Sequence, residues 1–266
     1  MRQLIVLLYY YHFRGVELME NLLQGENVHR FEAAYNRIHN KLIDLVYPTR
    51  RHIPYGEALH SAKKLHNIVK YNYDILRQFG QLRNALVHRK IRNDFYIAEP
   101  HNEIVEEIEK ICELLYIPPL ALSIASQPVT TYTTTTPLKI ILNKIKDKGF
   151  SQFPIYDENE FQGLLTEGGI ANWLACNIIN NSVSLDNVTA IDILKNEKKH
   201  NVRFLSKDCS IYDLEGTFEK SFEENLKLEA IIITHSGSTK QKPIGIVTSW
   251  DLVKIDHTTL SIASHV

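Results

Sequence analysis

The chain has 266 residues, of which 44% are hydrophobic and 23% are charged, and its formal net charge is −1 at pH 7. This composition is typical of globular proteins, and the length accommodates about two domains of ordinary size. A net charge near zero excludes a globally basic nucleic-acid-binding protein and a long acidic tail. Three scattered cysteines, Cys112, Cys176 and Cys209, lack metal-ligand spacing, which indicates buried thiols in a reducing compartment.

The N-terminal sequence MRQLIVLLYYYHF contains an apolar run that is too short to span a bilayer. No small-residue cleavage site follows it, so a secretory signal peptide is not indicated. We expect residues 1–15 to be an N-terminal extension or a first structural element. We also expect a cytoplasmic protein with no membrane contact.

Residues 16–118 have the spacing of helices. Phe31, Tyr35, Ile38 and Leu42 recur at three- and four-residue steps, which places them on one face of a helix. A final amphipathic segment, NEIVEEIEKICELL, carries acidic residues in its early turns and ends before Pro118 and Pro119. Four or five helices joined by short loops predict an antiparallel helical bundle.

The pattern changes after Pro119, where helical and strand-like segments alternate and a repeat appears. Each copy has a Thr or Ser helix start, an amphipathic helix, a short apolar strand, a turn, a strand led by glycine, and another helix. The strands are FPIYD and GLLT in the first copy, and AIIIT and GIVTSWD in the second. The predicted fold class is therefore α+β with two domains: an all-α antiparallel bundle followed by an α/β repeat pair.

The order of TTTTPL, GFSQFPIYD and GLLTE, followed later by GIVTSWDL, resembles a pair of cystathionine-β-synthase (CBS) domains. The resemblance covers about residues 122–256, with the first domain at about 122–180, the second at 186–256 and a tail at 257–266. It implies a pseudo-symmetric module that binds adenine nucleotides (AMP, ADP or ATP) as regulatory ligands in clefts between the repeats. It also implies a homodimer.

The segment from Gly245 to Asp251 has two interpretations. Thr248 and Asp251 are three residues apart at the start of a predicted helix, so they fit a plain capping box. The CBS resemblance implies instead that Asp251 accepts hydrogen bonds from both ribose hydroxyls and that Thr248 faces phosphate. It further implies a wall around the adenine, contributed by Ala125, Thr130, Phe150, Ser151 and Ile246.

The first repeat departs from this pattern because Gly169 stands three residues after Thr166, where the second repeat has an aspartate. A glycine has no side chain that could accept a hydrogen bond from a ribose. We therefore expect one good nucleotide site, at Thr248 and Asp251, and a weak or absent site at Thr166.

The helical half carries a second candidate site, in QLRNALVHRKIRNDF. Asn84 and His88 are four residues apart and share a helix face, and Arg83 adjoins Asn84. An imidazole that titrates near neutral pH can move a 2′-hydroxyl proton or protonate a leaving oxygen. A guanidinium can stabilise the charge that develops on a phosphate. This set of side chains suits cleavage of a phosphodiester without a metal.

The string Arg83-Asn84-x-x-x-His88 also resembles the Arg-x4-6-His signature of HEPN domains. The resemblance covers about residues 16–118 and implies a helical bundle of a family in which many members are metal-independent ribonucleases with a site at a dimer interface. Three interpretations stay open: an active ribonuclease, an inactive HEPN-like bundle, and a chance match. The cations Arg89, Lys90 and Arg92 fit either a stabilised helix end or contact with RNA.

Together these features predict a CBS pair that senses adenine nucleotides and regulates a HEPN-like ribonuclease domain. The alternative is a non-catalytic nucleotide-binding regulatory protein whose bundle serves dimerisation or partner binding. Neither interpretation requires a metal.

Overall fold

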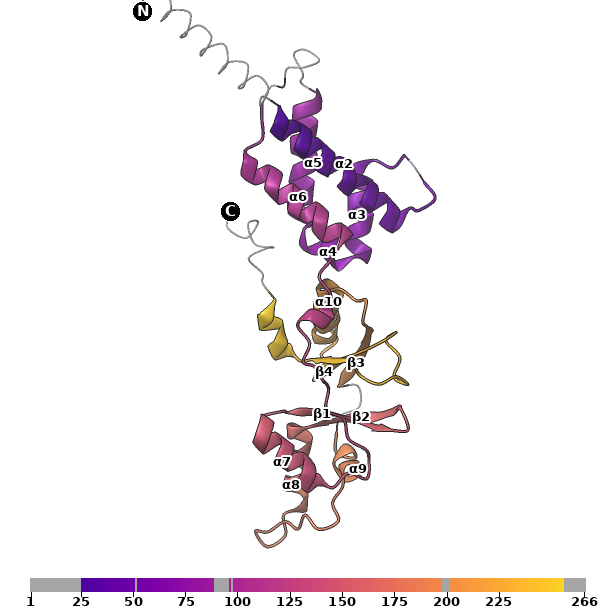
Figure 1. Ribbon diagram of the computed structural model, residues 1–266, viewed down its shortest axis with the longest axis vertical. Helices are drawn as coiled ribbons and strands as arrows, with labels where there is room; N and C mark the ends of the chain where they lie inside the picture. The colour runs from indigo at the N-terminus through magenta and orange to yellow at the C-terminus, as the bar shows by residue number, and fades with distance from the viewer. Residues whose placement is uncertain (1–24, 51, 89–95, 97, 198–200, 256–266) are drawn as a thin grey trace, which may run out of the picture. The chain divides into compact units, whose positions relative to one another are not determined.

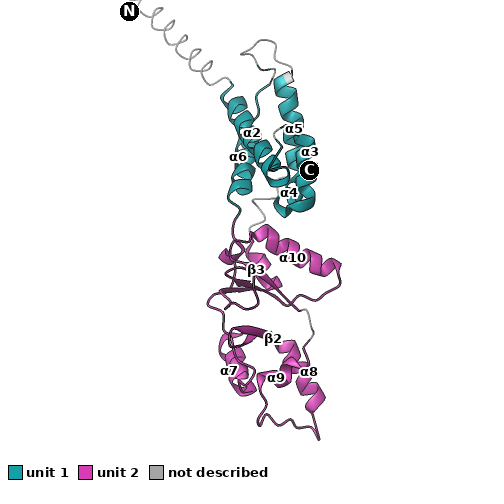
Figure 2. Ribbon diagram, turned by 90° about the vertical axis from the view of Figure 1, so that its right-hand side faces the viewer, with its two compact units in different colours: residues 1–118, 258–266 teal, residues 119–257 magenta. Residues whose placement is uncertain are grey.

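The structure is a computed structural model, and it describes residues 25–50, 52–88, 96, 98–197 and 201–255 (Figure 1). The chain divides into two compact units. Unit 1 comprises Met1–Pro118 with Thr258–Val266, and unit 2 comprises Pro119–His257 (Figure 2). The N-terminal extension and the C-terminal tail expected from the sequence lie outside the described residues. A helical first unit followed by a mixed helix and sheet unit agrees with the fold class predicted from the sequence.

The secondary-structure elements in the described part of unit 1 are all helices: α2 (Glu26–Val46), α3 (Tyr55–Leu65), α4 (Asn67–Tyr71), α5 (Tyr73–His88) and α6 (Asn102–Tyr116). The predicted apolar face of α2 is confirmed, since Phe31, Tyr35, Ile38 and Leu42 are all buried. Phe31 is fully buried and its ring meets that of Phe79 on α5 edge to face, 5.8 Å between centroids. Burial of this face against the other helices is the main stabilising contribution in the unit.

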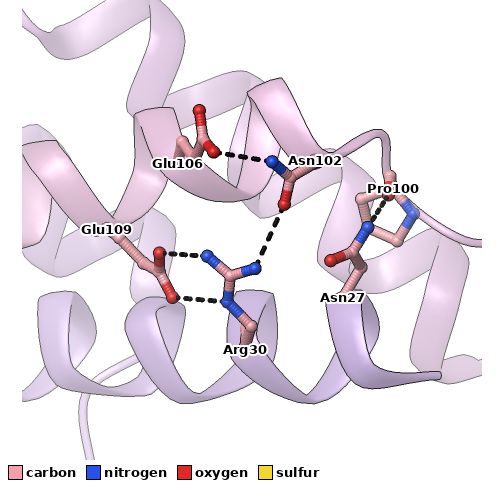
Figure 3. Close-up of polar contacts among 6 residues, drawn as sticks. All are labelled: Asn27, Arg30, Pro100, Asn102, Glu106 and Glu109. Carbon is pink, nitrogen blue, oxygen red and sulfur yellow. Dashed lines mark hydrogen bonds and ion pairs between the residues drawn. The ribbon is translucent and has the colours of Figure 1, made fainter. Parts of the chain in front are cut away.

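A row of polar contacts joins α2 to α6 along the surface (Figure 3). Arg30 donates through Nε and Nη2 to the two carboxylate oxygens of Glu109, at 3.1 and 2.7 Å, and through Nη1 to Asn102 Oδ1 at 3.1 Å. Asn27 Nδ2 donates to the carbonyl oxygen of Pro100 at 3.1 Å (Figure 3). A two-pronged contact of this kind sets the orientation of the helices as well as adding energy.

The order of these contacts shows that α2 and α6 run parallel. Asn27 meets Pro100, Arg30 meets Glu109, and the carbonyl oxygen of Arg37 accepts from the Tyr116 hydroxyl at 3.2 Å. Residue numbers therefore rise together along both helices. The antiparallel bundle predicted from short loops is wrong for this pair, because α6 begins next to the start of α2, where Glu99 accepts from the Gly25 amide.

The part of unit 2 that the structure describes contains two sheets. In the first, β1 (Gln152–Asp157) pairs antiparallel with β2 (Glu160–Thr166). In the second, the order is β3-β4-β5, where β3 (Val202–Ser206) is parallel to β4 (Ala230–Thr234) and β4 is antiparallel to β5 (Gly245–Val247). The helical elements of the unit are η1 (Ala121–Ser123), α7 (Leu138–Lys148), α8 (Glu167–Asn177), α9 (Ala190–Leu194), α10 (Ile211–Glu223) and η2 (Ser249–Lys254).

The repeat found in the sequence is confirmed as a repeat of elements. Helix, strand, strand and helix follow one another as α7-β1-β2-α8 and again as α10-β4-β5-η2. In the second copy β3 pairs with β4 over five residues. In the first copy the segment that corresponds to β3 forms only one isolated parallel bridge, between Tyr132 and Ile155. The two copies are thus similar in order and unequal in sheet length.

The copies exchange their leading segments. The segment η1 precedes the first copy, yet Ala121 and Ile124 pack in the core of the second with Leu214, Ile231 and Val247. The helix α9 precedes the second copy, yet Ala190 and Ile193 pack in the core of the first. Ser126 and Ile246 exchange backbone hydrogen bonds at 2.9 and 3.2 Å, which extends β5 by a bridge from the first copy. Each repeat therefore depends on a segment that lies next to the other repeat in sequence.

Candidate functional site

A cavity of about 170 Å³ lies in unit 2, between the first copy and the end of β5. One wall comes from the segment after η1 and from the turn between α7 and β1, which begins with Gly149. Gly149 ends α7 at φ 67°, a conformation that glycine adopts without strain, and the chain then turns to present Phe150 and Ser151. The other wall is Ile246 on β5, with Thr248 and Asp251 directly after it.

Asp251 forms the predicted capping box with Thr248. Its Oδ2 accepts from the Thr248 amide at 2.7 Å and from the Thr248 hydroxyl at 3.0 Å. The residue is buried, with 9% of its surface exposed, and it also lines the cavity. The cap uses Oδ2 of this carboxylate, and the same residue faces the cavity.

Lys254 holds the second oxygen of Asp251. Its Nζ donates to Oδ1 at 2.6 Å and to the carbonyl oxygen of Ile124 at 3.2 Å. The sequence analysis missed Lys254, although its spacing of three residues from Asp251 is a local signal for an ion pair on a helix. The helix that carries both residues is a six-residue 3-10 helix.

Most of the residues assigned to the ligand from sequence meet in this cavity. Those that line it are Thr130, Phe150, Ser151, Ile246, Thr248 and Asp251. Ala125 is not among the lining residues; it packs against Gly245 beneath β5, where a Cβ on the glycine would lie 2.9 Å from the Ala125 methyl. Its assignment to the adenine wall stays a prediction. The lining residues not foreseen are Ser126, Pro128, Val129, Gly149 and Gln152.

The corresponding position in the first copy has a different arrangement. Thr166 caps α8, and its hydroxyl accepts from the Gly169 amide at 2.9 Å. Its own amide donates to Oε1 of Glu197 at 2.6 Å. Burial raises the pKa of Glu197, hydrogen bonds from Thr166 oppose the rise, and the nearby Glu229 adds to it. Glu197 was not foreseen, because it lies 31 residues from Thr166 and no local pattern links the two.

A larger cavity, of about 560 Å³, lies in unit 1 between α2, α3 and α5. Arg83 and Asn84 line it, as expected of residues in one site, together with Arg77, Tyr35 and His39. The Arg83 guanidinium lies 5.6 Å from the centre of the Tyr35 ring. At this distance a cation is attracted to the face of the ring.

Buried and half-buried aromatic side chains shape this cavity. The Tyr55 ring packs 4.6 Å from that of Tyr35 and reaches Gly80, where a Cβ would lie 3.0 Å from the ring. The Tyr55 hydroxyl donates to the Leu76 carbonyl at 2.8 Å, and burial raises the pKa values of both tyrosines. These tyrosines remain neutral at physiological pH, and the permanent charges that line the cavity are the guanidiniums of Arg77 and Arg83.

The remaining residues of the helical candidate site are only partly described. His88 is the last residue of α5, and its side chain lies outside the described part of the structure. Arg89, Lys90 and Arg92 lie outside it altogether. Among the described residues, no group of three or more His, Cys, Asp or Glu side chains is arranged to hold a metal ion.

Within the described ranges, every helix is too short or too polar to cross a membrane.

A comparison with protein-family models matches residues 121–176 to the CBS domain. The curated proteins contain no match to this chain. Similar solved structures include the CBS domain pair of a protein in complex with 5′-methylthioadenosine and S-adenosyl-L-methionine. That pair is 20% identical, with a TM-score of 0.37, and covers 52% of this chain and 94% of its own.

Two further similar structures are CBS proteins. A CBS domain-containing protein from Thermotoga maritima is 14% identical, with a TM-score of 0.37, and covers 52% of this chain and 93% of its own. A hexameric CBS-CP12 protein from bloom-forming cyanobacteria is 14% identical, with a TM-score of 0.40, and the match covers 53% of this chain and 70% of that protein's chain. The residues that match the CBS domain model, 121–176, include α7, β1, β2 and most of α8.

Proposed function

We propose that unit 2 is a CBS pair that binds one adenine nucleotide as a regulatory ligand in the cavity at Thr248 and Asp251. One observation carries the proposal: the cavity brings Thr130, Phe150 and Ser151 of one copy against Ile246, Thr248 and Asp251 of the other. The family match to residues 121–176 and the repeated element order support it.

The chemistry of the cavity suits a nucleoside. Phe150 is 40% exposed and offers a ring face on which a purine can stack. The carboxylate of Asp251 has acceptor capacity on Oδ1 for a ribose hydroxyl, once the Lys254 ammonium moves aside. The volume of about 170 Å³ lies below the roughly 300 Å³ at which sites for larger ligands begin. The phosphates would therefore extend out of the cavity, where the released Lys254 can meet them.

Calorimetric titration with AMP, ADP and ATP tests this proposal. Asp251→Asn should weaken binding at least tenfold, because an amide cannot replace a carboxylate that accepts from a diol. Asp192→Asn is the matched control: Asp192 forms the same capping box with Thr189 and the same ion pair, with Lys195 at 3.0 Å, but it does not line the cavity. Equal weakening in both variants would attribute the loss to helix capping and reject the ribose contact.

A second candidate function belongs to unit 1, and the placement of Arg83 and Asn84 in one cavity supports it. We propose that the unit is a HEPN-like, metal-independent ribonuclease, with His88 as the acid or base and Arg83 as the stabiliser of charge on the phosphate. The alternative is a non-catalytic bundle that serves dimerisation or partner binding. In either case the chain would act as a homodimer, and nucleotide binding in unit 2 would regulate it.

Cleavage of a labelled RNA in the presence of EDTA separates these alternatives. An active site requires cleavage by the wild-type protein and loss of at least a hundredfold in His88→Ala and Arg83→Ala. Arg37→Ala is the control, because its guanidinium lies over Tyr116, 5.2 Å from the ring centre, rather than in the cavity. No cleavage by the wild-type protein with or without AMP, while AMP still binds, would favour the non-catalytic module.

A further inference from the structure

The first copy replaces its missing carboxylate with one from a distant part of the chain. In the second copy the Thr248 amide donates to Asp251, three residues ahead, at 2.7 Å. In the first copy the Thr166 amide donates to Glu197 at 2.6 Å. The donor is the same in both cases, a threonine amide where a strand ends, and the acceptor is a carboxylate in both. The carboxylates differ in origin, since Asp251 belongs to the same helix cap as Thr248 and Glu197 lies 31 residues from Thr166.

Glu197 also occupies the space that a side chain at position 169 would need. A Cβ built on Gly169 would overlap the carboxylate carbon and Oε1 of Glu197. The neighbouring Gly168 has no such constraint, because a Cβ there would meet only the Thr166 hydroxyl, at an ordinary 3.6 Å. The Glu197 carboxylate therefore lies where a side chain at position 169 would begin, which is the position where the second copy has its aspartate.

The exchange of leading segments brings Glu197 to this place. It lies three residues after α9, whose Ala190 and Ile193 are fully buried in the core of the first copy. Leu194 fixes the approach further, since its side chain contacts Gly163, where a Cβ would lie 2.9 Å from Leu194 Cδ2. Ser126, three residues after η1, makes the corresponding contact with β5 of the second copy. The packing of α9 and Leu194 against the first copy therefore holds the chain that leads to Glu197 in place.

The charges nearby are unfavourable for an anionic ligand. Lys227 pairs with Glu229 at 2.7 Å, and both Glu197 and Glu167 also act on its charge. Three carboxylates around one ammonium leave an excess of negative charge, which disfavours a phosphate there. The cavity at Asp251 contrasts with this, because its carboxylate is balanced by Lys254.

We propose that Glu197 is a built-in occupant of the first copy's ribose position, which closes that position and limits each chain to one nucleotide. The limit on nucleotide number rests on the function proposed above. The placement of Glu197 against Gly169 does not, so it is tested separately.

The first test is a thermal-unfolding cycle without ligand. Gly169→Ala should lower the unfolding midpoint by roughly 2–4 °C, because the added methyl displaces the Glu197 carboxylate and so removes its hydrogen bond from the Thr166 amide. In the Glu197→Ala background the same substitution should be neutral or stabilising, since alanine is favoured over glycine in a helix. Gly168→Ala is the control and should be neutral or stabilising in both backgrounds. Equal destabilisation by Gly169→Ala in both backgrounds would overturn the proposal.

The second test counts nucleotides by calorimetry with AMP. The wild-type chain should bind one AMP, and the double variant Gly169→Asp/Glu197→Ala should bind two, because it has a carboxylate at the ribose position and the space for it. Gly169→Asp alone should still bind one. Two AMP per wild-type chain, reduced to one by Glu197→Ala, would show that Glu197 binds ligand and would overturn the proposal. A chain that binds no AMP, yet gives the expected unfolding cycle, would reject the nucleotide function and the limit on number while leaving the placement of Glu197 established.

Discussion

The ammonium of Lys254 lies 2.6 Å from Oδ1 of Asp251, and it donates a hydrogen bond to this oxygen. The helix cap uses the other carboxylate oxygen, Oδ2. Since Lys254 also donates to the Ile124 carbonyl, it ties η2 of the second copy to the segment that leads into the first. A ribose hydroxyl that approaches Oδ1 must compete with this ammonium. In the proposed nucleotide site, this ion pair therefore opposes ligand binding at Oδ1.

Replacing Lys254 by methionine should strengthen the binding of adenosine. Half of the Lys254 side chain is exposed, and a pair of this exposure contributes about 0.2–1 kcal/mol, so the gain should be at most about fivefold. Adenosine is the probe because it has no phosphate that could gain or lose a contact with the lysine. Lys195→Met, which removes the equivalent pair at Asp192, should leave the affinity unchanged. Weaker adenosine binding in Lys254→Met would contradict this view of the pair.

Glu197→Gln should alter how stability depends on pH. Burial raises the pKa of Glu197, so the folded protein keeps this proton at pH values where the unfolded chain has released it. The contribution is complete below the ordinary glutamate value of about 4.3, declines as pH rises from there to the raised value, and is constant above it. The difference in unfolding free energy between the wild-type protein and Glu197→Gln, measured in urea at a series of pH values, should show this decline, because the amide oxygen of the variant can still accept from Thr166 but does not titrate. Parallel pH curves would refute it.

Asp192→Asn should have the opposite effect on the acid side. The Thr189 amide and the Lys195 ammonium lower the pKa of Asp192, so its contribution is present above the ordinary aspartate value and is lost as pH falls through the lowered value. The wild-type advantage over Asp192→Asn should therefore shrink with acidification below about pH 4. The midpoint of thermal unfolding, compared for the two proteins at each pH, measures it. An advantage that persists unchanged at the lowest pH would count against the assigned hydrogen bonds.

Phe31→Ala should destabilise the helical unit strongly. The side chain is fully buried between α2 and α5, so its removal leaves a cavity and should lower the free energy of unfolding by about 3–5 kcal/mol. Glu32→Ala, the next residue on α2 and outside the buried face, should change it by less than about 0.5 kcal/mol. Helical circular dichroism followed through urea unfolding gives both values. A loss below about 1 kcal/mol for Phe31→Ala would contradict the packing of α2.

The features that could be predicted from the sequence depend on contacts between near neighbours. The buried face of α2 follows from three- and four-residue spacing, and the cap at Thr248 and Asp251 from a spacing of three. The repeat of helix, strand, strand and helix was visible because both copies keep the order of their apolar and turn residues. The CBS resemblance, which assigned residues by their place within each copy, named six of the eleven residues that line the cavity.

What the sequence alone determined is thus the set of elements, their repetition and their local caps. Only the tertiary structure decided that α2 and α6 run parallel, that η1 and α9 pack in the core of the other copy, and that Glu197 fills the place left by Gly169. The physical reason is the distance along the sequence over which each kind of interaction acts. Periodicity and capping act over a few residues of one helix or strand, whereas these three features are contacts between segments tens of residues apart, where the packing of whole apolar faces selects the arrangement.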